Sequence, residues 1–415
     1  MNYKDQIHPS EGAKKLLEIE PKLHSETISI NEGLNRIVTK DYYALINVPS
    51  FDKSPYDGYA LRGEDTIGAT KDNPVEFKII EEIPAGYFPK EKVSKMEASK
   101  ILTGGSVPEG ANVCIKYELT EFDNEKVRIF SEISPNSDII KAGEDTKKGS
   151  LLVEKGTKLT PGHLGLLSSQ GIDEISVYKK PTIGIFVTGS ELRSPGEEIE
   201  PGQIFESNNI TFKSIFENLG FNTKVYGIVK DDEDLIEKQT LKAIKEVDIL
   251  VTTGGASVGD YDYGLSSIKN LGGEVLFWKT AMKPGGSIVV SKLEEKVVIG
   301  LSGNPASAIL GLYKVCLPFL KKSLGLKDIY PKELKLILKK DLNKKSPRVR
   351  FLRGKLEIED GKAYFIEKSE QGNGVLSSFI DCDVLVEIPW GSAEIKAGTL
   401  VTGYRVSSIF GSIGE

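Results

Sequence analysis

The sequence predicts a multi-domain α/β plus β protein in which a central, doubly wound α/β domain is flanked by domains of short β-strands. Three observations support this fold class. The chain has 415 residues, more than a single hydrophobic core usually serves. Between residues 181 and 326, apolar strands alternate with helical segments, which is typical of a parallel sheet with helices on both faces. On either side, short strand-like runs are separated by Gly, Pro and Asn.

The α/β region, residues 181–326, begins with the strand-like run PTIGIFVTG. Helical spacing follows in ITFKSIFENLG, and Gly220 stands where a helix commonly ends. The later elements are expected in this order: strand TKVYGIV, helix DLIEKQTLKAIKEV, strand DILVTTGG, helix YGLSSIKNLGG, strands EVLFWKT and KVVIGLSG, and a helix starting at NPASAILGLYKVCLPFL. We expect the loops after the strands to emerge at one edge of the sheet.

Three further domains are expected around this region. Residues 42–138 predict an inserted β domain with strands in VEFKIIEEI, SKILTGG, NVCIKYELTEF and KVRIFSEI. Residues 1–41 and 139–180 predict one discontinuous N-terminal domain, which contains a helix after Ser10, a strand pair in GSLLVEKGTKLT and a helix around PGHLGLLSSQG. Residues 327–415 predict a C-terminal, barrel-like β domain with strands in LKLILKK, KLEIED, KAYFIEK and DVLVEIP.

Composition excludes several classes of protein. The formal net charge of −6 argues against a nucleic-acid binder, which carries a basic excess. No apolar run approaches the ~20 residues that span a bilayer, and the first residues lack an apolar signal core, so we expect a cytoplasmic protein. The 3 cysteines and 3 histidines are scattered, which argues against a disulfide framework or a zinc ribbon. Catalysis is therefore expected to use Asp, Glu, Lys, Ser, Thr and backbone N–H groups.

A glycine-rich stretch, VDILVTTGGASVGDYD, follows a strand of the α/β region at residues 247–262. Ligands of open parallel sheets bind outside the carboxyl ends of the strands. Glycines let the backbone approach a ligand closely, and the exposed N–H groups of such a turn form an anion-binding concavity. The stretch predicts a binding loop; a tight strand–helix turn is the alternative.

Further polar turns occur in TGSEL (188–192), KDDED (230–234), WKTAMKPGGS (278–287) and LSGNPASA (301–308). In the last, Asn304 stands at the N-cap position and Pro305 at the first helical position, so this helix start is a second candidate phosphate site. Carboxylates beside phosphate-binding turns suit a phosphorylated ligand held with a divalent cation such as Mg²⁺. The candidate carboxylates, each of which could instead be a solvated surface charge, are Glu191, Asp231, Asp260 and Asp262.

The inserted β domain has two marked stretches of its own. SFDKSPYDGYALRGED (50–65) places Asp57 between Tyr56 and Gly58, and a Thr-Gly-Gly turn begins at Thr103. Hairpin turn chemistry would explain both stretches without any function. Physical reasoning alone does not connect them to the α/β domain.

Together these stretches resemble the molybdopterin molybdenumtransferase family, the bacterial enzymes related to the C-terminal domain of gephyrin. The resemblance covers nearly the whole chain and rests on motifs that occur in the family's order. These motifs are SPYDGYA (54–60), TGGSVPEGA (103–111), GED (143–145), TGSEL (188–192), SNN (207–209), TGGASVGDYD (253–262), MKPG (282–285) and GLSGNPASA (300–308).

The resemblance implies a central domain of the molybdopterin-binding type and a specific reaction. Adenylylated molybdopterin would release AMP while molybdate is inserted at the dithiolene, in a Mg²⁺-linked step that gives molybdenum cofactor. The family's homodimer implies an active cleft between the α/β domain of one subunit and the β insertion of the other. Other molybdenum-cofactor assembly proteins are further candidate partners, whereas nucleic acid and membranes are not expected.

The family's motifs also imply roles for individual residues. The expected catalytic residues are Asp57 and Thr103, which would reach across the dimer, together with Asp262, Lys279 and Lys283. Both lysines would offset the charge of phosphate or molybdate. Glu191, Asp231, Asp260 and Asp262 would serve the metal or the nucleotide, and Asp145 matches the family's GED turn.

The resemblance implies a larger group of binding residues, in which Ser307, Arg348 and Ser378 are expected to contribute to the oxyanion site. The forked donors of Arg suit tetrahedral oxyanions. The expected cofactor-binding residues are Thr188, Gly189, Glu191, Asn208, Asp231, Thr253, Gly254, Gly255, Ser257, Gly259, Pro284, Gly285, Gly303, Asn304, Pro305, Ser307, Arg348 and Ser378.

The chain departs from the family's pattern at three places. The family commonly reads PGKP where this chain has Pro284-Gly285-Gly286-Ser287, so a lysine expected near molybdate is missing. A charge-assisted hydrogen bond of that kind contributes ~1.5–3 kcal/mol. Ser302 replaces a proline of GLPGNP, and Cys382-Asp383 replaces the family's Ala-Asn. Three alternatives therefore stay open: a tungstate-using transferase, a non-catalytic molybdopterin-binding or scaffold paralogue, and another nucleotide-hydrolysing enzyme on the same α/β domain.

Overall fold

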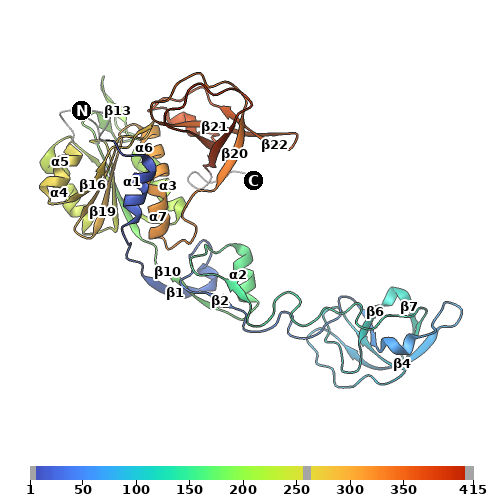
Figure 1. The fold of residues 1–415 in the computed structure, drawn as a ribbon. Coiled ribbons are helices and arrows are strands. Elements are labelled where there is room, and N and C mark those ends of the chain that lie inside the picture. Colours follow the sequence, from blue (N-terminus) through green and yellow to red (C-terminus); the bar gives the residue numbers. More distant parts are fainter. Residues whose placement is uncertain (1–5, 256–262, 407–415) are drawn as a thin grey trace.

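The structure, a computed structural model, describes residues 6–255 and 263–406. The chain forms an elongated molecule (Figure 1) in which the α/β domain and the C-terminal β domain lie side by side at one end. A small linking domain separates them from the inserted β domain, which lies at the far end of the molecule. Among the described residues, no helix is long and apolar enough to cross a membrane.

The α/β domain is built on a six-stranded sheet with the order β14-β11-β15-β19-β18-β16. Its first four strands run parallel, as predicted. The prediction of an all-parallel sheet is wrong at β18, which was not predicted and runs antiparallel to both neighbours. A tight hairpin, in which Leu293 pairs with Lys296, reverses the chain between β18 and β19. The strands are β11 (Thr182–Thr188), β14 (Asn222–Val229), β15 (Ile249–Thr253), β16 (Glu274–Trp278), β18 (Ile288–Leu293) and β19 (Lys296–Leu301).

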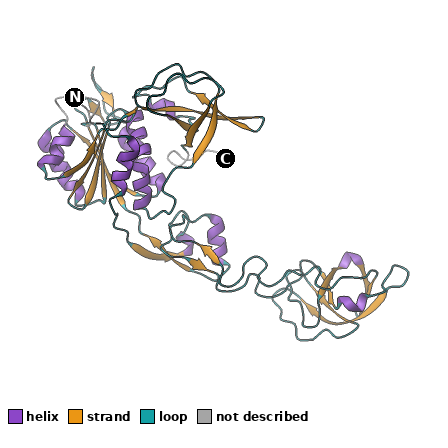
Figure 2. Ribbon diagram, in the orientation of Figure 1, coloured by secondary structure: helices purple, strands orange, loops and turns teal. Residues whose placement is uncertain are grey.

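Helices cover both faces of this sheet (Figure 2), as predicted. Successive residues of a strand point to opposite faces, so Ile185 packs with α3 in one core and Phe186 packs with α4 in the other. The helices are α3 (Asn208–Leu219), α4 (Glu233–Ile244), α5 (Tyr263–Asn270) and a continuous run made of α6 (Pro305–Gly311), the π-helical η5 (Leu312–Cys316) and α7 (Leu317–Ser323). Gly220 ends α3 with a left-handed φ of 112°, where the sequence predicted the helix end.

The first helix, α1 (Pro9–Leu17), packs on the α/β domain (Figure 1), whereas most of residues 25–41 belong to the linking domain. Its Leu16 is fully buried in the core that also contains α7. The Nζ of Lys322 on α7 donates to the Leu17 carbonyl at 2.9 Å. The described N-terminal segment is therefore divided between two structural units.

The linking domain consists of two short strand pairs and the helix α2 (Pro161–Ser168) around a small apolar core. β1 (Ser25–Ser29) pairs with β10 (Glu174–Tyr178), and β2 (Tyr42–Tyr43) pairs with β9 (Leu151–Val153). Beyond them the chain runs out to the inserted domain and back as two paired segments. Lys53 and Ile140 exchange backbone hydrogen bonds of 2.9 and 3.0 Å at the end of this pair.

The inserted β domain has a six-stranded sheet with the order β6-β3-β5-β4-β8-β7. β3 (Gly58–Leu61) lies inside the stretch that sequence reasoning described only as turn-rich. At Gly58, an added Cβ would lie 1.8 Å from the Ile115 carbonyl oxygen, so strand pairing requires glycine there. The other strands are β4 (Val75–Ile83), β5 (Glu97–Ile101), β6 (Val113–Lys116), β7 (Thr120–Phe122) and β8 (Lys126–Ile129).

In the C-terminal domain, five strands close into a barrel through the order β21-β22-β20-β24-β23 and a further pairing of β21 with β23. β17 (Met282–Lys283), from the α/β domain, adds to the edge of β21 and links the two domains. The barrel strands are β20 (Glu333–Leu338), β21 (Val349–Glu359), β22 (Lys362–Glu367), β23 (Val384–Ile388) and β24 (Leu400–Arg405). Short helical turns complete the described chain at η2 (Ile30–Glu32), η3 (Gly63–Thr66), η4 (Tyr117–Leu119) and η6 (Leu376–Phe379).

Candidate functional site

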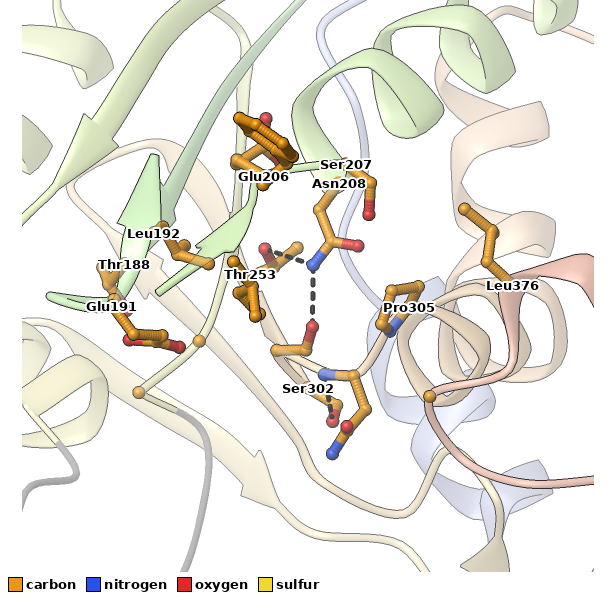
Figure 3. Close-up of a pocket in the computed structure, with 18 of the residues that line it drawn as sticks. Thr188, Glu191, Leu192, Glu206, Ser207, Asn208, Thr253, Ser302, Pro305 and Leu376 are labelled. Atoms are coloured by element: carbon orange, nitrogen blue, oxygen red, sulfur yellow. Dashed lines mark hydrogen bonds between the residues drawn. The ribbon is translucent and has the colours of Figure 1, made fainter. Parts of the chain in front are cut away.

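A cavity of about 680 Å³ lies at the carboxyl ends of β11, β15 and β19 (Figure 3). Such pockets in open α/β sheets bind ligands at this edge, and ~300–1,000 Å³ is the usual range for small-molecule sites. One wall is the short strand pair β12 (Leu192–Arg193) and β13 (Ile204–Phe205). Gly374 and Leu376 of the C-terminal domain form part of the opposite wall, so two domains build the cavity.

Predicted residues from five separate segments line this cavity. Each segment ends or begins a regular element, and parallel strand ends bring the segments to one edge of the sheet. The predicted residues on the lining are Thr188, Gly189, Glu191, Asn208, Asp231, Thr253, Gly254, Gly255, Gly303, Asn304 and Pro305.

The glycine turn after β15 allows the backbone to pass close to β11. Gly254 and Gly255 have left-handed φ values of 91° and 60°. An added Cβ on Gly254 would lie 2.4 Å from the carbonyl oxygen of Thr188, which is closer than atoms can approach. The turn therefore needs glycine at position 254 both for its conformation and for space.

Asn208, the first residue of α3, joins two of the loops around the cavity (Figure 3). Its side-chain Nδ2 donates to Thr253 Oγ1 at 3.0 Å and to the Gly303 carbonyl at 2.9 Å. The Asn208 side chain is 7% exposed, and its Oδ1 has no hydrogen-bond partner among the described residues. Thr188 Oγ1 is likewise buried without a partner in the described parts of the chain. Buried polar atoms normally have partners, so both atoms suit contacts with a ligand.

Two helices begin at the cavity, α3 at Asn208 and the long run 305–323 at Pro305. The Asn209 N–H donates to Glu206 and the Ser307 N–H to the Asn373 carbonyl, so it is mainly the positive dipole ends of the two helices that favour an anion. Asn304 occupies the predicted N-cap position, but its side chain makes no capping hydrogen bond. Instead, the Ser302 hydroxyl accepts from the Asn304 N–H at 3.2 Å. Ser302, which stands where the family has proline, thus orders the turn before the helix.

The charged side chains on the described lining of the cavity are all acidic. Glu191, Glu206 and Asp231 all lie on the lining, and no Lys or Arg of the described chain does. Asp231 Oδ2 accepts from the Ser190 N–H at 2.9 Å, and the Ser190 hydroxyl accepts from the Asp231 N–H at 3.3 Å. This reciprocal pair fixes the TGSEL turn to the loop after β14. An anionic ligand in this cavity would need a bound cation to offset the carboxylates.

The two predicted lysines lie outside the cavity lining. Lys279 is buried, and its Nζ lies 3.6 Å from the centroid of the Trp278 ring, in a cation–π contact. Lys283 is exposed on β17, opposite Arg350 of the barrel. The sequence placed both in one polar loop, but the strand pairing of β17 holds that loop against the C-terminal domain.

Pro284, Gly285 and Ser307 lie behind the cavity rather than on its lining. The buried Ser307 hydroxyl accepts from the Gly285 N–H at 3.0 Å and so ties this loop to α6. At Gly286, an added Cβ would lie 2.6 Å from the carbonyl oxygens of both Thr280 and Met282. The backbone of this chain therefore has no room for the lysine that the family commonly carries there.

In the C-terminal domain, Arg348 precedes β21 and is partly exposed, while the buried Ser378 donates its hydroxyl to the Val375 carbonyl. Neither lies on the cavity lining. Arg353, which sequence reasoning missed, is fully buried and donates to the Gly372 carbonyl from its two terminal guanidinium nitrogens, Nη1 and Nη2, at 3.3 Å. Burial lowers its pKa from the usual arginine value. Arg353 thereby positions the loop that carries Gly374 into the cavity wall.

Asp57 and Thr103 lie together in the inserted domain, at the far end of the molecule from the cavity (Figure 1). Asp57 Oδ1 accepts from both the N–H and the hydroxyl of Thr103 at 2.7 Å. These two hydrogen bonds lower the pKa of the exposed Asp57 carboxyl. Asp145 lies on the paired connection to that domain, where its N–H donates to the Val48 carbonyl at 3.0 Å.

Four predicted residues lie outside the described residues: Ser257, Gly259, Asp260 and Asp262. Among the described residues, no group of three or more His, Cys, Asp or Glu side chains is arranged to hold a metal ion.

Sequence reasoning missed part of the lining. Ile204 and Phe205 line the cavity, and two apolar residues shortly before the SNN motif were the available indication in the sequence. The buried Glu206 accepts from the Asn209 N–H at 2.6 Å, and an acidic residue just before a helix start was its indication. The lining residues that were not predicted are Leu192, Ile204, Phe205, Glu206, Ser207, Ser287, Ser302, Gly374 and Leu376.

Family models match most of the chain in three consecutive segments. Residues 8–171 match the MoeA N-terminal region, domains I and II. Residues 184–322 match a probable molybdopterin binding domain, and residues 335–405 match the MoeA C-terminal region, domain IV. A molybdopterin molybdenumtransferase of Staphylococcus aureus (strain COL) is 34% identical over 395 residues, which cover 95% of this chain and 94% of that protein. The chain belongs to the molybdopterin molybdenumtransferase family.

Other relatives and solved structures agree with this family. A molybdopterin molybdenumtransferase of Staphylococcus epidermidis is 31% identical over 95% of this chain and 94% of its own length. The crystal structure of a molybdopterin biosynthesis MoeA protein from Pyrococcus horikoshii has a TM-score of 0.83 at 32% identity, covering 96% of this chain and 100% of that chain. As a member of the molybdopterin molybdenumtransferase family, the chain is a transferase, and the predicted fold class is confirmed.

Proposed function

We propose that this transferase acts in molybdenum cofactor biosynthesis, inserting molybdate into adenylylated molybdopterin with release of AMP. The observation that carries the proposal is the cavity at the sheet edge, where two helix N-termini and a glycine turn surround buried, unpartnered polar atoms. Asn208 Oδ1 suits a hydrogen-bond donor of a pterin or ribose, and Thr188 Oγ1 suits a phosphate oxygen. The name of the family, molybdopterin molybdenumtransferase, indicates the substrate class.

The residues of the cavity fit a magnesium ion held together with phosphate. Mg²⁺ usually binds one or two carboxylates, substrate phosphate and waters. Glu191 and Asp231 are exposed carboxylates on the lining, and Thr188 and Thr253 line the cavity as well. Glu191 and Asp231 would hold the ion, and Asp260 and Asp262 are proposed to join them. Bound Mg²⁺ would neutralise charge that develops on the phosphoanhydride as it is cleaved.

The chain's own groups would bind and orient the substrate. Cleavage of a phosphoanhydride depends mainly on positioning and charge stabilisation. The positive dipole ends at the starts of α3 and of the run 305–323 would attract phosphate oxygens. Asn208 would keep the Thr253 and Gly303 loops at a fixed spacing through its two hydrogen bonds. Phe205, 48% exposed on the cavity wall, offers an apolar surface to a planar ring.

We also propose a homodimer in which Asp57 and Thr103 complete the cavity of the partner subunit. Two observations support this arrangement. The pair is exposed and carries a carboxylate with a lowered pKa, so it is charged at neutral pH. Within one chain it lies at the opposite end of the molecule from the cavity (Figure 1).

The test is AMP release from adenylylated molybdopterin with Mg²⁺, in the presence of molybdate, tungstate or neither. We expect oxyanion-dependent release in the natural chain and a loss of about a hundredfold or more in Asp231→Asn and Glu191→Gln. Asp234→Asn is the matched control, because this nearby carboxylate on α4 lies outside the lining. If no oxyanion promotes release, the proposed reaction is wrong.

A second candidate, a molybdopterin-binding protein without turnover, is favoured by two features: no described residue of the lining is Lys or Arg, and the backbone at Gly286 leaves no room for a side chain. Calorimetry with molybdopterin separates the two candidates. Tight binding together with no AMP release under any oxyanion would establish the binding protein in place of the enzyme.

A further inference from the structure

A second hollow of about 420 Å³ lies between α3 and η6, next to the candidate site. Its wall on α3 includes Ile215, and its wall on the barrel side includes Phe379 and Ile380. Ile380 is 67% exposed, which is a large exposure for an isoleucine that lines a hollow. We call this hollow the α3–η6 groove, defined by Thr211, Ser214, Ile215, Asn218, Leu376, Phe379 and Ile380.

The described chain ends close to the α3–η6 groove. The N–H of Val406 donates to the Asp383 carbonyl at 3.0 Å, and Asp383 follows Ile380 by three residues. Val406 is fully buried in the same core as Phe379. Whatever follows Val406 therefore starts beside the groove.

The residues after Val406 have the length and composition to fill the groove. They read SSIFGSIGE, residues 407–415, and include Ile409, Phe410 and Ile413. Nine residues span up to about 30 Å when extended, which is ample for a groove that begins at the exit point. The segment has a single charged side chain, Glu415, so binding would bury little charge.

We propose that residues 407–415 bind in the α3–η6 groove of their own chain, with Phe410 as the main apolar contact. Leu376 lines both this groove and the catalytic cavity. The bound segment would therefore pack behind a residue of the cavity wall and fasten the barrel to the α/β domain. This inference concerns the attachment of two domains and holds whether or not the proposed function is correct.

Disulfide trapping tests the position of the segment. We would combine Ile380→Cys with Phe410→Cys, in a Cys382→Ser background that removes the partly exposed native thiol. A disulfide requires Cα atoms within about 7 Å, so mild oxidation should join these two positions within one chain. The matched control pairs Phe410→Cys with Glu217→Cys, an exposed position on α3 that does not line the groove. We expect at least about tenfold more intramolecular disulfide in the first pair, read by peptide mass spectrometry.

Equal trapping in both pairs, or none, would overturn the proposal. A disulfide between two chains would also overturn it, because the groove would then hold a second copy's segment.

Hydrogen exchange gives an independent readout. Phe410→Asp and a chain ending at Val406 should both increase exchange of the 211–218 amides by about threefold or more, while α4 is unchanged. Ser408→Asp introduces the same charge two residues away and should have no effect. Added SSIFGSIGE peptide should restore slow exchange in the shortened chain. Unchanged exchange in Phe410→Asp would overturn the proposal, and this full-length variant guards against misfolding of the shortened one.

Discussion

Thr103 holds the carboxylate of Asp57 with two hydrogen bonds of 2.7 Å, one from its backbone N–H and one from its hydroxyl, both to the same Oδ1. The second carboxylate oxygen is left for other contacts. The pair joins two turns of the inserted domain that are 46 residues apart in the chain.

The first prediction concerns the pKa of Asp57. Thr103→Val removes the hydroxyl bond and keeps the backbone bond, so the lowered pKa should rise part of the way toward its ordinary value of 3.8. A lowered pKa stabilises the fold at pH values above the unfolded pKa, and this stabilisation is lost as the pH falls through the folded pKa. The natural chain should therefore be more stable than the variant at neutral pH, and this difference should disappear as the pH falls through the folded pKa. A carboxylate NMR titration measures the pKa; Thr103→Ser, which keeps a hydroxyl, should leave it unchanged.

The second prediction tests the shared cavity. If Asp57 acts in the partner's cavity, Asp57→Asn and Asp231→Asn should each be inactive alone. Mixing them by unfolding and refolding should restore about one quarter of the natural activity, because half of the random dimers contain one intact cavity. Mixing Asp231→Asn with Glu191→Gln is the control, since both changes fall on the same cavity. Activity that stays absent in the first mixture contradicts the shared site.

The third prediction concerns the glycine turn. Gly254→Ala should destabilise the α/β domain and lower ligand affinity, because the new Cβ meets Thr188 at 2.4 Å in addition to the strain of a left-handed φ. Overpacking of this kind typically costs ~1–3 kcal/mol. Gly272→Ala is the matched control: its φ is 78° and its Cβ would meet nothing within 4 Å. Differential scanning calorimetry should show the larger loss for Gly254→Ala, and equal losses would show that strain alone matters.

The fourth prediction concerns the missing lysine. Gly286→Lys should destabilise the protein rather than restore the family's pattern, because its Cβ meets two backbone carbonyl oxygens at 2.6 Å. Ser287→Lys places a cation from the adjacent lining residue, which already has a Cβ. We expect Ser287→Lys to keep the unfolding temperature and to bind molybdate more tightly by about tenfold or more. Differential scanning calorimetry measures the unfolding temperature of both variants, and titration calorimetry measures their affinity for molybdate. A Gly286→Lys variant as stable as the natural chain would show that the loop rearranges easily.

Sequence patterns predicted the elements whose causes are local. The helix end at Gly220 follows from its left-handed φ, and the alternation of strands and helices follows from the apolar spacing. The direction of β18 depends on the hairpin at Glu294, and no local sequence pattern predicted that direction. The helix α1 was expected, but apolar spacing does not say which domain buries Leu16. That choice depends on α7, which lies about 300 residues later in the chain.

The candidate site divides in the same way. Glycine turns and helix starts can be predicted from sequence because a positive φ or a helix start limits the residue type. Gly254 and Pro305 were predicted in this way, and both line the cavity. Lys283 was expected at the ligand because of its match to the family's MKPG motif, and its place off the cavity lining depends on the pairing of β17 with β21. Gly374 and Leu376 reach the cavity only because the barrel docks beside the α/β domain. Contacts between domains cannot be predicted from the sequence of a single segment.

The backbone pairing of Lys53 with Ile140 places the two connections to the inserted domain next to each other. A domain whose ends meet is suited to transplantation, because its removal leaves a gap that a short turn can close. A chain shortened by joining residue 53 to residue 140 through two or three glycines should therefore still fold. The excised unit, closed on itself in the same way, would be a separate module that could be exchanged between relatives.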